Sequence, residues 1–141
     1  MKKKSTNDLH NELIAASDLN RFLTENEDEF INQDFSELLH KLFQKKNISK
    51  AALAKRSSMS DVYLYQIFSN GRKPSRNRIL CLCFGLSATL EETQELLKHS
   101  GHAQLYAKDR RDAIVIYGIV HNMELTETND MLFAEHEDTL F

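Results

Sequence analysis

The residues of this 141-residue chain that are best suited to chemistry form a basic segment from Lys41 to Arg78. This segment, called here the basic island, contains ten Lys or Arg residues and a single acid, Asp61, which gives a local charge of +9. Because the whole chain carries −3, the residues outside the island carry −12. A cluster of positive charge in an otherwise acidic protein is typical of a surface that binds the phosphates of a nucleic acid.

Two short helices are expected to position these charges. Ser49 is the expected N-cap of a helix over residues 50–56, and Ser60 that of a second helix over residues 60–69, with a Ser-Ser-Met turn between them. A helix, a short turn, a second helix and a following basic loop form the arrangement of a helix-turn-helix. The second helix would then enter the major groove of double-stranded DNA.

The exposed face of the 60–69 helix is expected to read bases. Gln66 is the strongest candidate, because its amide can make paired hydrogen bonds to adenine. Asp61 could accept a hydrogen bond from cytosine, although its charge repels phosphate. The predicted base-reading residues are Ser60, Asp61, Val62, Tyr63 and Gln66. The predicted phosphate contacts are Lys50, Tyr65, Arg72, Lys73 and Arg76.

The rest of the chain is also predicted to be helical, because one Pro and four Gly are too few for the turns of a sheet. Residues 1–34 are expected to form an acidic helical arm, with nine carboxylates and one Arg between Ser5 and Glu37. Its most acidic run is Glu25–Phe30. The simpler interpretation is a solvated surface arm. The alternative is an arm that competes with DNA for the basic island.

An internal repeat organises the C-terminal half. A shift of 35 residues aligns Arg76–Tyr106 with Arg111–Phe141, with seven identities in 31 positions that fall on core and capping residues. The β-branched run Ala113–Val120 could pass for a buried strand, but this alignment predicts a helix. We therefore expect a helix-turn-helix domain over residues 35–106 and a C-terminal helix pair over 107–141, which repeats 76–106. The apolar Tyr117, Met131 and Phe133 would either complete the core or build an interface with a second subunit.

The segments Ile48–Ala54 and Leu64–Ser75 resemble the Xre and lambda-repressor-like helix-turn-helix family. The resemblance covers about residues 35–99 and implies a five-helix DNA-binding domain. It places Lys50 at a position that touches DNA. This chain has Ser58 where the turn of the family usually has Gly. It also has Phe68 where a polar residue is usual, and we expect the N-terminal arm or the C-terminal helix pair to cover this ring.

Together these features predict a sequence-specific transcriptional regulator that binds double-stranded DNA as a homodimer. The arm or the C-terminal helix pair could also bind a protein partner. The alternative is a protein-interaction module on the same fold, such as an antitoxin or a kinase-associated adaptor, which the acidic overall charge and Asp61 favour.

We do not expect an enzyme, a metal site or another cofactor, since no catalytic grouping, phosphate loop or pattern of metal ligands stands out. Cys81 and Cys83 are expected in a buried helix, pointing apart, which suits a reducing cytoplasm. No apolar run approaches the roughly 20 residues that span a bilayer.

Overall fold

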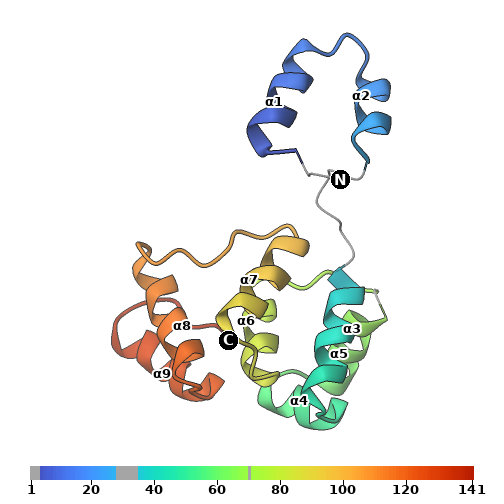
Figure 1. Ribbon diagram of the computed structural model, residues 1–141. Coiled ribbons are helices and arrows are strands. Elements are labelled where there is room, and N and C mark those ends of the chain that lie inside the picture. The colour runs from blue at the N-terminus through green and yellow to red at the C-terminus, as the bar shows by residue number, and fades with distance from the viewer. Residues whose placement is uncertain (1–3, 28–34, 70) are drawn as a thin grey trace. The chain divides into compact units, whose positions relative to one another are not determined.

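The computed structural model describes residues 4–27, 35–69 and 71–141, and within these ranges it is helical without any strand (Figure 1). The chain divides into two compact units, Met1–Asn32 and Gln33–Phe141. The prediction of an all-α protein is therefore confirmed. The helices are α1 (Thr6–Ala15), α2 (Leu19–Glu25), α3 (Phe35–Lys46), α4 (Lys50–Arg56), α5 (Asp61–Phe68), α6 (Arg76–Gly85), α7 (Leu90–His99), α8 (Arg110–Val120) and α9 (Leu125–Ala134).

The first unit is the short helical hairpin α1–α2. The Ser5 hydroxyl accepts a hydrogen bond from the Asp8 amide, and the Asp8 carboxylate accepts one from the Ser5 amide, so α1 begins with a capping box. α1 buries none of its residues, whereas α2 buries Phe22. Part of the predicted acidic run, residues 28–30, lies outside the described residues.

The second unit has three layers, with α6 and α7 between α3–α5 on one side and α8–α9 on the other (Figure 1). α4 packs on α6 and α3 packs on α7, while α5 packs on both α3 and α4. Because α6 lies in the middle layer, it is buried from Ile79 to Gly85, as expected for a helix that is apolar almost all round. The run Ala113–Val120 lies in α8, so its prediction as a helix is confirmed.

The 35-residue sequence repeat is also a structural repeat. Gln94 bonds both backbone groups of a loop through its side-chain amide, and its Oε1 accepts from the Leu105 amide at 2.7 Å. Asn129, 35 residues later, makes a similar pair of bonds: its Oδ1 accepts from the Leu140 amide at 2.6 Å, and its Nδ2 donates to the carbonyl of the next residue, Phe141, at 3.1 Å. The residues two positions after the last residues of α6 and α8 share a left-handed backbone, with φ of 52° at Ser87 and 53° at Asn122. Each copy is therefore a helix pair closed by the same loop geometry.

The two helix pairs face each other across an approximate two-fold axis. Arg76 binds Asp112, and Arg111 binds Asn77 with its Nη2 3.0 Å from the amide oxygen. Asn77 and Asp112 are equivalent in the repeat, so the two contacts are reciprocal. The helix contacts are reciprocal in the same way, because α6 packs on α9 and α7 packs on α8. The pairs therefore bury the same face against each other, whereas solenoid repeats would stack one face on the next.

Candidate nucleic-acid interface

The helix-turn-helix consists of α4, a short turn and α5. The Ser49 hydroxyl accepts from the Ala52 amide at 3.1 Å, and the Ser60 hydroxyl accepts from the Tyr63 amide at 3.0 Å. Both predicted N-caps are therefore confirmed. In the turn, Ser58 has a φ of 53°, the left-handed conformation that Gly adopts most easily. The backbone here takes the left-handed conformation even though the chain has Ser in place of Gly.

α5 separates its residues cleanly into a core face and a solvent face. Leu64, Ile67 and Phe68 are buried, and they anchor the helix on α3 and α4. Of the predicted base-reading and phosphate residues of this helix, Ser60, Asp61, Val62 and Tyr65 are exposed, and Gln66 and Tyr63 are half-buried, with Tyr63 packed against the core. The predicted contact residues outside α5 are Lys50, Arg72 and Lys73, which are exposed, and Arg76, which is half-buried.

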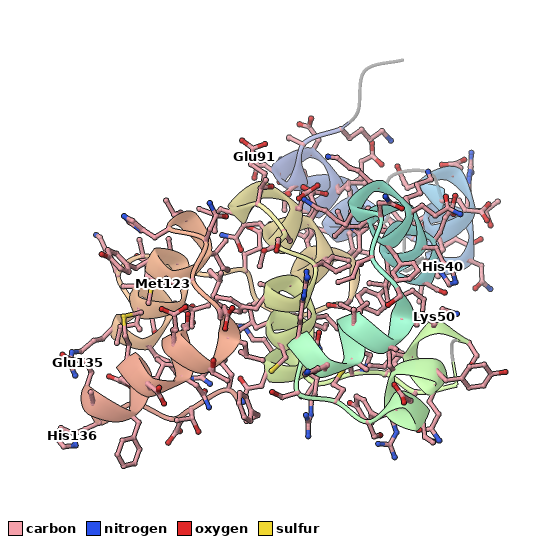
Figure 2. The ribbon with its side chains drawn as sticks, turned by 90° about the horizontal axis from the view of Figure 1, so that it is seen from below. His40, Lys50, Glu91, Met123, Glu135 and His136 are labelled. Atoms are coloured by element: carbon pink, nitrogen blue, oxygen red, sulfur yellow. The ribbon has the colours of Figure 1, made fainter. Side chains whose placement is uncertain are left out.

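Phe68 is covered by neighbours within the helix-turn-helix domain. The rings of His40 and Phe43 on α3 each meet its ring edge-on at a centroid distance of 5.1 Å. The ammonium of Lys50, at the start of α4, lies 5.2 Å from the centre of the same ring. Figure 2 shows Lys50 and His40 on the same side of the second unit. Only 4% of Phe68 is exposed. These contacts come from α3 and α4 of the same domain, whereas the N-terminal arm or the C-terminal pair was expected to cover this ring.

Two guanidinium groups pack against the ring of Tyr63. The Arg72 and Arg78 guanidinium carbons lie 5.0 Å and 5.3 Å from its centroid, within the range of cation–π attraction. Arg78 also donates a long hydrogen bond of 3.5 Å to the carbonyl of Ser58 in the turn. Sequence reasoning gave Arg78 no role, because its only visible signal was its charge. Its contact with the turn depends on where α6 begins in space.

The fold neutralises part of the basic island. Lys45 and Lys46 both bind Glu92 on α7, at 3.0 Å and 2.9 Å, and Lys41 binds Glu37 at 3.6 Å. Arg76 binds Asp112. Within the described part of the chain, the six remaining basic residues of the island have no ion-pair partner: Lys50, Lys55, Arg56, Arg72, Lys73 and Arg78.

Glu92 fastens α7 to α3. Burial opposes its ionisation, but hydrogen bonds from the Thr89 amide and from the ammonium groups of Lys46 and Lys45 outweigh that cost. As a result, the pKa of Glu92 is lowered to about 2. The same carboxylate completes the capping box of α7 by accepting from the Thr89 amide at 2.9 Å.

The Arg76 side chain, at the start of α6, connects α6 to α8 and to the loop that precedes α8. Its guanidinium donates to the carbonyls of Ala103 at 2.9 Å and Gln104 at 3.2 Å, and it makes a paired contact with Asp112 at 3.2 Å and 3.0 Å. Its side chain is 23% exposed. Each guanidinium nitrogen already donates to an oxygen of the protein, so this placement favours a structural role over a phosphate contact. Asp112 also accepts from the Tyr106 amide at 3.0 Å.

The two cysteines are buried thiols. Burial raises the pKa of Cys81 to about 11 and that of Cys83 to about 12, because it disfavours the thiolate. Both groups therefore stay protonated near neutral pH. The described residues contain no cluster of three or more His, Cys, Asp or Glu side chains that could hold a metal. None of the helices in the described ranges is long and apolar enough to cross a membrane.

Comparison with known proteins gives no further assignment. No protein-family model, curated protein or solved structure matches this chain.

Proposed function

We propose that this protein is a transcriptional regulator that binds double-stranded DNA with α5 in the major groove. The observation that carries the proposal is the solvent face of α5, which presents Gln66, Val62 and Tyr65 together with basic residues of the island that have no ion-pair partner in the part of the chain that the structure describes. A polar amide on an exposed helix can read base edges, and unpaired basic side chains around it can bind phosphates.

The roles divide between the helix and its surroundings. Gln66 would read adenine, with Ser60, Asp61 and Val62 along the same face of the helix. Lys50, Arg72 and Lys73 would bind phosphates, and Tyr65 could add a hydroxyl contact. The regulator would act in the reducing cytoplasm and bind a two-fold operator as a homodimer, in the manner of the Xre-like family that it resembles.

Base reading by Gln66 can be separated from phosphate binding by Lys73. Selection of bound sequences from random duplex DNA with the full chain should enrich one motif. Gln66→Ala should relax one position of that motif and weaken binding to it by about 1–3 kcal/mol. Lys73→Ala should weaken binding to all sequences alike and reduce the salt dependence by about one contact. Failure of the full chain to enrich any motif would reject sequence-specific binding.

A protein-interaction module is the second candidate, and the exposed surface of α5 favours it. Val62 and Tyr65 are 68% and 65% exposed, and Asp61 carries a negative charge in the first turn of the helix. Apolar and acidic side chains suit a protein partner better than a phosphate backbone. In that case Gln66→Ala and Lys73→Ala would change no DNA affinity, because there would be none to change.

A further inference from the structure

Arg78 is a half-buried basic residue whose guanidinium makes few hydrogen bonds inside the protein. Its backbone is fixed in the first turn of α6, because its amide donates to the Ser75 hydroxyl at 3.2 Å. A guanidinium carries five N–H donors, yet the described residues accept a single long bond from Arg78, at the carbonyl of Ser58. By contrast, the guanidinium of Arg76 makes four bonds between 2.9 Å and 3.2 Å. Most of the donors of Arg78 are therefore available to an acceptor outside the chain.

The ring of Tyr63 brings Arg78 together with Arg72. The two guanidinium carbons lie 5.3 Å and 5.0 Å from its centroid, although Arg78 belongs to α6 and Arg72 follows α5. Tyr63 itself packs against the hydrophobic core, so the ring is a fixed support for both groups. Cation–π attraction can hold a guanidinium on a ring while its N–H groups stay free to donate.

No carboxylate balances these two cations in the part of the chain that the structure describes. Asp61, the single acid of the basic island, forms an ion pair with neither of them. Like charges on one ring repel each other, and a bound anion would relieve that repulsion. A phosphate group suits the site, because its oxygens accept paired hydrogen bonds from guanidinium donors. Since Arg78 contacts the turn before α5, this anion would lie near the start of that helix.

We propose that Arg78 binds a phosphate of the DNA backbone together with Arg72, and that Tyr63 positions both guanidinium groups instead of reading a base. This role of Arg78 rests on the proposed DNA binding. It adds a contact from α6, which lies outside the helix-turn-helix itself. Because α6 is the buried middle helix, the contact would fix the turn before α5 against the DNA backbone.

The role of Arg78 can be tested by the salt dependence with which the full chain binds a random duplex, followed by fluorescence anisotropy. Arg78→Gln removes the charge and should reduce the slope of log K against log salt concentration by about 0.9. Arg78→Lys should keep the slope, because the charge remains, but it should bind roughly 3-fold more weakly, because an ammonium lacks the planar fork. Arg56→Gln is the matched control and should leave the slope unchanged. Arg56 is also exposed, but it lines a hollow with Asn122 and Met123 in the turn between α8 and α9.

Two substitutions at Tyr63 test the support that its ring gives. Tyr63→Phe keeps the ring and should bind the duplex as the wild type does. Tyr63→Leu removes both cation–π contacts and should weaken binding roughly 5-fold. The same substitution should cost less in the Arg78→Gln background, because one of the two contacts is already absent there. Equal losses in the two backgrounds would separate Tyr63 from Arg78 and contradict the positioning role.

Urea denaturation of each variant separates phosphate binding from support of the turn. If Arg78 only supports the turn, Arg78→Gln should lower the urea midpoint and leave the salt slope unchanged, and that result would overturn the proposal. A slope that Arg56→Gln reduces equally would do the same. A wild-type chain that binds no duplex at low salt would reject DNA binding itself and the role of Arg78 with it. A wild-type chain that binds with a steep slope, matched by that of Arg78→Gln, would reject the role of Arg78 alone.

Discussion

The reciprocal contact between the two helix pairs can be tested at its two ends, which differ in charge. Asp112→Ala removes the carboxylate that binds Arg76 through two bonds and the Tyr106 amide through a third. Asn77→Ala removes the equivalent group at the other end, which accepts one bond from Arg111. The side chain at position 112 is 9% exposed, so its loss leaves a mostly buried guanidinium without its counter-ion.

The structure gives the two substitutions different costs. Breaking a buried pair by removing one partner costs about 3–5 kcal/mol, and the 23% exposure of Arg76 places this pair near the lower limit. We therefore expect Asp112→Ala to reduce the free energy of unfolding by about 3 kcal/mol. Asn77→Ala removes a single hydrogen bond to a charged group, and we expect a loss of about 1.5 kcal/mol.

Urea denaturation followed by circular dichroism measures both changes, with the midpoint and the slope fitted separately. The expected order is wild type, then Asn77→Ala, then Asp112→Ala, with the lowest midpoint for the last. Equal midpoints for the two variants would refute the view that a charged cross-link at Arg76 fastens the C-terminal pair. If Arg76 instead binds DNA phosphate, Arg76→Gln should reduce the salt dependence of DNA binding while leaving the midpoint unchanged.

Three further predictions concern the core. The lowered pKa of Glu92 means that its charge stabilises the fold above about pH 4.5 and that this contribution disappears as the pH falls toward about 2. In urea titrations, Glu92→Gln should reduce the free energy of unfolding by about 2 kcal/mol at pH 7 and by almost nothing at pH 2. The control Glu91→Gln, at an exposed position, should change it little at either pH. Equal losses for Glu92→Gln at both pH values would contradict the ion-pair account. Gly85→Ala would push a methyl group into the side chains of α4, so its unfolding midpoint should fall by the equivalent of about 1–3 kcal/mol, and an unchanged midpoint would show that α4 and α6 separate easily. Cys81 and Cys83 should react with a thiol reagent such as dithionitrobenzoate only after unfolding, so fast labelling of the native chain at pH 7 would show that α6 is accessible.

The local elements could be predicted well from the sequence. Ser49 and Ser60 each precede a helix, because their hydroxyls satisfy amides that a helix leaves unpaired. The repeat also identified α8 as a helix although its β-branched residues suit a strand. These features depend on neighbours within a few residues, or on an alignment within the chain, so the sequence alone contains them.

Contacts between distant segments could not be predicted in the same way. Arg76 was expected at phosphate, but it binds an acid 36 residues later. Lys45 and Lys46 count toward the charge of the basic island, but they bind Glu92 across the fold. A count of charges along the sequence overestimates the positive surface, because it cannot show which charges meet once the helices pack.

The apolar residues of the C-terminal pair are another feature whose role the sequence left open. From sequence, Tyr117 and Phe133 could complete the core or face a second subunit. Both are largely exposed in the folded chain, so they do not complete the core. The repeat is informative here only together with the structure, because the structure shows which equivalent face of the first pair is covered.

The salt dependence of DNA binding tests the central claim most directly. Fluorescence anisotropy with a random duplex should show that the full chain binds at low salt, with log K falling linearly against log salt concentration. Replacing Lys50, Arg72 and Lys73 together by Ala should reduce the slope by about 0.9 for each lost contact. Lys41→Ala is the control, because Lys41 pairs with Glu37 on α3, and it should leave the slope unchanged. No binding at low salt, or an unchanged slope in the triple variant, would contradict the assignment of this surface to DNA.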